Sequence, residues 1–269
     1  MSSCWSPVTF FGSVEPHIFA WATSFMFLFT VAVTSTIALS YGHVSGFPYI
    51  SDMGTTVPES SIFGLFLSIY SVLLGITVWN VYNTAPVQTT LSGWACIFGF
   101  GAAFGVEIVA NFQETVIFYA HMSGAMLAFS MAVTYMWVHT IINSRIRYFR
   151  FFCATSASLT MVTTSLTGMA ALAQFKGTSM PHWGPNDGGY TLHAVSVVTE
   201  WATASFINIF IFTLAKDIQL SDEHALLRNW FTEGRPSHQH LHSVQVQTQQ
   251  PSFSQNAATL ETTAASQIS

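Results

Sequence analysis

The chain contains six apolar runs, each long enough to cross a lipid bilayer, separated by short polar stretches. About 20 apolar residues span the hydrocarbon core, where only helices and closed barrels satisfy the backbone. The runs lack the strict alternation of a barrel strand. The sequence therefore predicts an all-α integral membrane protein, a bundle of six transmembrane helices at about residues 17–41, 61–82, 91–110, 116–142, 149–175 and 192–215.

Composition supports a lipid-facing surface. Charged residues make up 7% of the 269 residues, against about 25% in soluble domains. The lipid bilayer is thus the expected partner, and the lack of a basic block speaks against nucleic acid. No two of the three cysteines have disulfide or zinc spacing. No cofactor is predicted, and the first run is expected to be an uncleaved anchor.

The basic residues predict the orientation. One side of a six-span chain would carry six of the seven Lys and Arg residues, and the other side only Lys176. By the positive-inside rule, the N-terminus (residues 1–16) and the tail (residues 217–269) are cytoplasmic, flanking a membrane domain at 17–216. The tail is rich in Gln, Ser and Thr and is expected to be largely disordered after about residue 231.

Two polar loops are therefore predicted to face the lumen or the cell exterior: "PYISDMGTTVPESSIFG" (48–64) and "FKGTSMPHWGPNDGGYT" (175–191). Ionisable side chains near the same ends of the spans are candidates for function. With the loop carboxylates and histidines they are predicted to form one polar cluster: Asp52, Glu59, Glu107, His121, His182, Asp187, His193 and Glu200.

Three interpretations of this cluster stay open. The side chains serve as caps and loop anchors, or they form a pH-responsive network, because histidine titrates near neutral pH. The third interpretation is a metal or hydrolytic site. The sequence contains no H-E-x-x-H or G-x-S-x-G pattern to support it. No metal site and no catalytic residue is predicted.

Small residues and a short tail motif add two further predictions. Gly101, Gly105, Gly124 and Ala128 have helix-packing spacing in the third and fourth spans, which favours packing within the chain over homodimerisation. In the tail, Asp222 precedes Leu226 and Leu227 at the spacing of an acidic dileucine signal read by trafficking adaptors. An interfacial amphipathic turn is the alternative.

Three blocks in order resemble the DRAM family, the damage-regulated autophagy modulators, within the Frag1/DRAM/Sfk1 group of six-span membrane proteins. They are "FPYISDMGTTVPESSIFG", "VANFQETVIFYAHMSGAMLAFSMAVTYMWVHTII" and "HWGPNDGGYTLHAVSVVTEW". The resemblance covers about residues 47–217; the tail, Glu107 and the short fourth loop depart from it. Its signature positions fall on Ser51, Asp52, Gly54, Pro58, Glu59, Asn111, Phe112, Gln113, His121, Gly124, His182, Trp183, Tyr190, His193, Glu200 and Trp201.

The resemblance implies a multi-pass protein of lysosomal or late endosomal membranes that positively modulates autophagy, with links to stress and cell death and no settled catalysis. We expect the first and fifth loops to pack together through Asp52, Glu59, His121, His182 and His193, with a carboxylate beside a protonated His121 or His193. One alternative is a plasma-membrane, Sfk1-like adaptor for phosphoinositide kinase, whose cytoplasmic basic loop (Arg145, Arg147 and Arg150) touches anionic lipid. The other is a lipid-remodelling enzyme that uses the luminal cluster.

Overall fold

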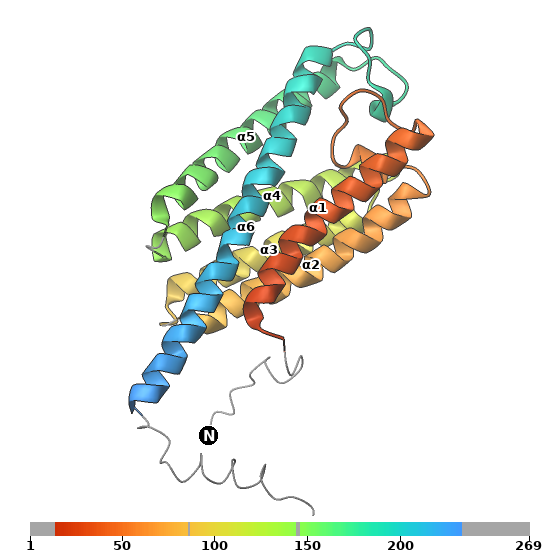
Figure 1. Ribbon diagram of the computed structural model, residues 1–269. Coiled ribbons are helices and arrows are strands. Elements are labelled where there is room, and N and C mark those ends of the chain that lie inside the picture. Colours follow the sequence, from red (N-terminus) through yellow and green to blue (C-terminus); the bar gives the residue numbers. More distant parts are fainter. Residues whose placement is uncertain (1–13, 86, 144–145, 233–269) are drawn as a thin grey trace, which may run out of the picture. The chain divides into compact units, whose positions relative to one another are not determined.

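The computed structural model describes residues 14–85, 87–143 and 146–232, and their side chains up to residue 221 (Figure 1). Within these ranges all regular structure is helical, which confirms the predicted fold class. The long helices are α1 (Pro16–Tyr41), α2 (Glu59–Thr84), α3 (Thr90–Asn111), α4 (Phe118–Ile142), α5 (Arg147–Gln174) and α6 (Tyr190–Thr232). Two short 3-10 helices, η2 (Asp52–Gly54) and η3 (Met180–His182), lie in the first and fifth loops. The chain divides into two compact units after Ser221, and the first unit contains α1 to α5 and the part of α6 up to that residue.

Consecutive helices are neighbours from α1 to α5. α6 closes the unit by bonding to helices that precede it: Ser24 of α1 donates to the Asn208 carbonyl, and Thr164 of α5 pairs with Thr199 at 2.7 Å. One end of this bundle therefore gathers the first, third and fifth loops (residues 42–58, 112–117 and 175–189).

Five of the described helices, α1 to α4 and α6, are long and apolar enough to cross a membrane. α5 has 28 residues but a lower mean hydropathy, because Ser and Thr are frequent in it. Several of these hydroxyls donate to the carbonyl four residues earlier, as Thr163 and Thr167 do, and so need no water. The span count and the cytoplasmic termini stay predictions.

α6 continues past the predicted end of the sixth span at residue 215. Lys216 and Asp217 lie inside the helix, and Asp217 is buried. The predicted boundary rested on the change in composition, but charged residues with partners on neighbouring helices do not end a helix. The backbone is helical up to Thr232, which includes Asp222, Leu226 and Leu227, whose side chains lie outside the described part.

α3 and α4 approach each other closely where small residues face one another. A Cβ atom added to Gly105 would collide with the Ala128 backbone nitrogen, and one added to Gly124 would lie 2.6 Å from Ile108 Cγ2. Gly101 is less crowded, with its nearest contact the flexible Met131 side chain. The four small residues thus pack helix against helix within one chain.

Gly105→Ala is expected to destabilise the protein by about 1–3 kcal/mol, because the new methyl group overlaps backbone that cannot yield. Gly93→Ala is the control in the same helix, since a Cβ there meets nothing within 4 Å; it should stabilise by about 0.4–1 kcal/mol. Thermal unfolding of the purified protein in detergent compares the two. Equal effects would contradict the close approach.

Candidate functional site

The first loop holds the other two loops of its end together. His182 Nε2 lies 3.1 Å from the Gly42 carbonyl oxygen, and the Ser45 backbone N–H donates to the Pro181 carbonyl. On its other side, Ser51 Oγ donates to Glu114 Oε2 of the third loop at 2.8 Å. We call these three segments the loop assembly. The expected packing of the first loop on the fifth is present.

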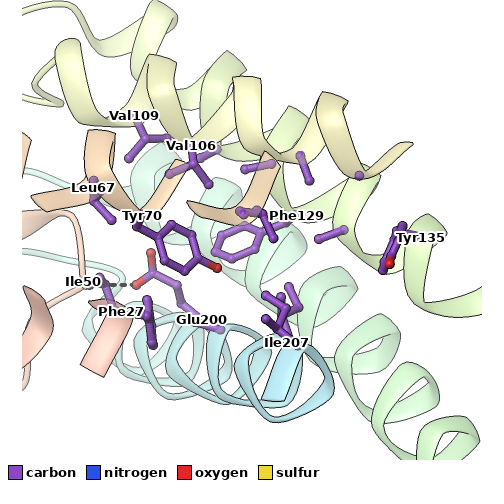
Figure 2. Close-up of a pocket in the computed structure, with 18 of the residues that line it drawn as sticks. Phe27, Ile50, Leu67, Tyr70, Val106, Val109, Phe129, Tyr135, Glu200 and Ile207 are labelled. Carbon is purple, nitrogen blue, oxygen red and sulfur yellow. Dashed lines mark hydrogen bonds between the residues drawn. The ribbon is translucent and has the colours of Figure 1, made fainter. Parts of the chain in front are cut away.

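The first loop is also anchored to α6. The Ile50 N–H donates to Glu200 Oε2 at 3.0 Å (Figure 2). The Trp201 indole N–H donates to the Pro48 carbonyl at 2.9 Å, and its ring stacks on Phe47. The signature residues Glu200 and Trp201 thus serve to fix backbone of the first loop.

Asp52 is buried at the centre of the loop assembly. One carboxyl oxygen, Oδ2, accepts the Tyr49 N–H at 3.0 Å, while Oδ1 has no hydrogen-bond partner among the described residues. Burial, followed by the charge of Glu114, raises the pKa of Asp52 to about 8, although the Tyr49 bond opposes this. Gly54 supports the turn, because a Cβ atom at this position would collide with the Phe63 ring. The Asp52 carboxyl is therefore largely protonated in neutral or acidic surroundings.

Glu59 begins α2, directly after Pro58, and is paired with a histidine that the sequence reasoning missed. His43 Nδ1 lies 2.6 Å from Glu59 Oε1, and the Glu59 side chain is fully buried. His43 lies in the polar stretch just after the first predicted span, and its position on the predicted luminal side was the available signal. The carboxylate–histidine pair that we expected at His121 or His193 is formed here instead.

His121 and His193 have other surroundings. His121 Nδ1 lies 2.7 Å from the Phe112 carbonyl oxygen, which can only accept, so Nδ1 carries the proton. His193 stacks on Trp183 with ring centroids 4.3 Å apart, and Tyr49 meets it edge-on. No hydrogen bond to His193 Nδ1 is formed by the described residues.

The remaining predicted residues split between the loop assembly and other places. Tyr190 begins α6 beside His193, Asp187 Oδ2 accepts the Gly184 N–H, and the Gln113 carbonyl accepts two N–H groups of the third loop. Glu107 and Asn111 lie apart. Glu107 Oε1 accepts from Ser68 of α2 and from Asn111, so Glu107 joins α3 to α2 and is not part of the cluster. Glu114 was missed, because "NFQET" was read only as a short turn.

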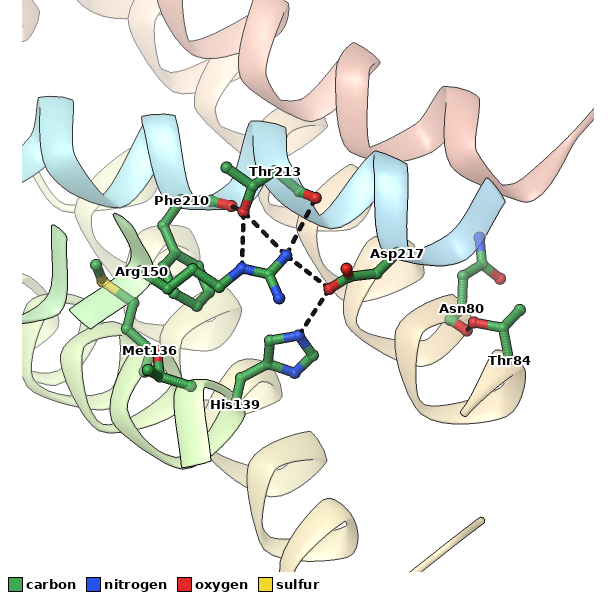
Figure 3. A network of polar contacts seen from close by, with 9 residues as sticks. Asn80, Thr84, Met136, His139, Arg150, Phe210, Thr213 and Asp217 are labelled. Carbon is green, nitrogen blue, oxygen red and sulfur yellow. Dashed lines mark hydrogen bonds and ion pairs between the residues drawn. The ribbon is translucent and has the colours of Figure 1, made fainter. Parts of the chain in front are cut away.

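A second polar cluster lies at the far end of the bundle and corrects the predicted basic loop (Figure 3). Arg150 lies in the first turn of α5 and is fully buried. Its Nη2 is 2.6 Å from Asp217 Oδ2, and its Nε donates to Thr213 Oγ1. His139 Nε2 lies 3.1 Å from the same Asp217 oxygen. Arg150 is therefore unable to touch anionic lipid, Arg147 is exposed, and Arg145 lies outside the described residues.

Two adjoining cavities lie beneath the loop assembly. The larger, about 440 Å³, is bounded by α4, α5, α6 and the loops. The smaller, about 130 Å³, lies among α2, α3, α4 and α6 (Figure 2). Ser51, His121 and Glu200 line both, so that polar groups of the loop assembly stand where the cavities meet.

Comparison with known proteins covers this whole membrane unit. Residues 16–221 match the family described as Frag1/DRAM/Sfk1/Cwh43P N-terminal domain. The chain is 33% identical over 222 residues to the human DNA damage-regulated autophagy modulator protein 2, covering 74% of this chain and 80% of that one. It is 30% identical to the human modulator protein 1 (70% and 84%) and 25% identical to the Xenopus laevis modulator of macroautophagy TMEM150B-B (76% and 84%). No solved structure matches.

Proposed function

This chain belongs to the Frag1/DRAM/Sfk1 family, and from that membership we propose that it positively modulates autophagy in lysosomal or late endosomal membranes, without catalysis. It is a multi-pass membrane protein, and its relatives are named autophagy modulators. The observation that carries the proposal is the extent of the similarity: it spans the helices and the loop assembly together. The words "DNA damage-regulated" in those names support a link to stress, and through it to cell death.

The loop assembly supports a role for luminal pH. Asp52 has a pKa raised to about 8 by burial, and His43 is paired with the buried Glu59. Asp52 lies in the first loop, and the His43–Glu59 pair joins that loop to the start of α2. We propose that an acidic lumen keeps Asp52 neutral and the loops closed over α6, and that this closed face is the active form.

Autophagic flux tests the modulation itself. Depleting the protein should lower the accumulation of an autophagosome marker after lysosomal inhibition, and re-expression should restore it. Unchanged flux on both depletion and overexpression would contradict the proposal. A lipid product that disappears in Asp52→Asn or His121→Ala protein would contradict the non-catalytic role.

The compartment has its own prediction. The Leu226→Ala/Leu227→Ala variant should move from lysosomes to the cell surface, because trafficking adaptors would no longer read the acidic dileucine motif. Imaging of the tagged full-length protein beside lysosomal and plasma-membrane markers measures this. Leu241→Ala is the control, because the residue four positions before Leu241 is Ser237 and not an acidic residue. Surface signal for the unmodified protein would overturn the lysosomal location and favour the adaptor alternative.

A further inference from the structure

The larger cavity has an apolar body and a polar end. Methionines form much of the body: Met122 and Met126 come from α4, and Met161 and Met169 from α5. Its volume of about 440 Å³ lies within the range of about 300–1,000 Å³ found for small-molecule sites. Methionine side chains adapt to irregular ligands. The body is therefore suited to a flexible hydrocarbon chain.

The cavity opens toward lipid between α4 and α5. Met126 and Met169 line it and are 47% and 72% exposed in the isolated chain. Met126 would face acyl chains in a bilayer, because α4 is long and apolar enough to cross the membrane. A ligand would thus enter sideways from the membrane.

The polar end offers hydrogen-bond acceptors and the carboxylate of Glu114. Glu114 and Glu200 both line it. His121 Nδ1 is bonded to a carbonyl, so that the neutral ring presents Nε2 as an acceptor. No lysine or arginine is among the described residues that line the cavity.

The serine and threonine hydroxyl donors of the cavity are already used. Ser51 donates to Glu114, and Ser196 donates to the Thr164 carbonyl. Thr164, Ser165 and Thr203 donate to other groups of α5 and α6. A head group that donates hydrogen bonds therefore fits this end, and a positive charge complements the Glu114 carboxylate. A phosphate or carboxylate head would meet like charge.

We propose that this cavity binds a single-chain amphiphile with a protonated amine head, a long-chain amine taken from the bilayer. The amine lies against Glu114 and Glu200, and the chain runs among the methionines of α4 and α5. This inference does not depend on the compartment or on the effect on autophagy.

Photolabelling of the full-length protein in phosphatidylcholine vesicles tests the inference. Three probes share one 18-carbon chain with one diazirine and differ only in the head: a primary amine, an alcohol and a carboxylate. The amine should label α4 and α5 peptides, with an apparent affinity about tenfold above that of the alcohol, or about 1.4 kcal/mol. The carboxylate should label least.

Variants separate the head group from the chain. Glu114→Gln keeps an acceptor for Ser51 but loses the charge, and should weaken amine labelling about tenfold. Glu107→Gln is the matched control, because that carboxylate lies in α3 and does not line the cavity. Met126→Trp should block the opening and lower labelling by all three probes. Should Glu114→Gln fail to fold, the comparison of the three heads on the unmodified protein makes the same test.

Equal labelling by the three heads would overturn the proposal, since it would show partition into lipid only. Stronger labelling by the alcohol, or a Glu114→Gln protein that labels like the unmodified one, would also overturn it.

Discussion

Arg150→Met is expected to destabilise the folded protein by about 3–5 kcal/mol, the usual cost of removing one partner from a buried ion pair. Arg150 is fully buried and forms the 2.6 Å ion pair with Asp217. Without the guanidinium, the buried Asp217 carboxylate keeps only His139 as a partner among the described residues. Thr213 would also lose the bonds that it accepts from Arg150. Thermal unfolding in detergent should show a lower midpoint and less folded protein.

Two further variants make this prediction specific. Arg147→Met removes an exposed arginine from the same helical turn and should change stability by less than about 1 kcal/mol. Arg150→Met/Asp217→Leu removes both charges and should recover most of the loss, because no unpaired charge remains buried. A single Arg150→Met variant as stable as Arg147→Met would contradict the buried pair.

Asp52→Asn is expected to flatten the dependence of stability on pH. The pKa of Asp52 is about 8 in the folded protein, against 3.8 for an aspartate in water. The folded state thus binds a proton that the unfolded state releases between these values. The contribution of Asp52 to stability is therefore highest below pH 4 and falls by about 1.4 kcal/mol per pH unit up to pH 8. Between pH 5 and pH 8 this single group accounts for about 4 kcal/mol.

The Asn variant should therefore be more stable than the unmodified protein at pH 8, and nearly equal to it below pH 4. Unfolding midpoints at several pH values measure the difference, in which the contributions of other groups cancel. The titratable groups that interact with Asp52 are Tyr49, Glu114 and Glu200. Asp187→Asn is the control for losing one carboxylate from this side. Parallel profiles for the Asn variant and the unmodified protein would contradict the raised pKa.

Much of the fold could be predicted from the lengths of the apolar runs alone, because only helices and closed barrels satisfy the backbone hydrogen bonds in a bilayer. The predicted runs correspond to helices, with boundaries shifted by a few residues at most ends. α6 continues beyond the predicted sixth span, and the sequence does not show that Asp217 has partners on α4 and α5. For the same reason Arg150 was predicted to lie in a basic loop, because the sequence does not show its contact with Asp217.

The sequence predicted on which side of the membrane the site residues lie and at what depth, but not which residues contact one another. Polar residues on one side of the membrane were expected to gather, and Ser51, Asp52, His182 and Glu200 do lie in or beside the loop assembly. His43, Tyr49 and Glu114 were missed because single residues in short loops carry no periodicity. The pairing of His43 with Glu59, rather than of His121 or His193 with a carboxylate, depends on the path of the first loop.

α6 is held at two depths by unrelated contacts. Near one end Glu200 binds the first loop, and near the other Asp217 binds α4 and α5. The two residues are seventeen positions apart, about 26 Å along the helix axis. Sliding of α6 along its axis would break the contacts of Glu200 or those of Asp217, so α6 is fixed in position along its axis. Movement that admits a lipid must therefore come from the α4–α5 side, where methionines line the cavity.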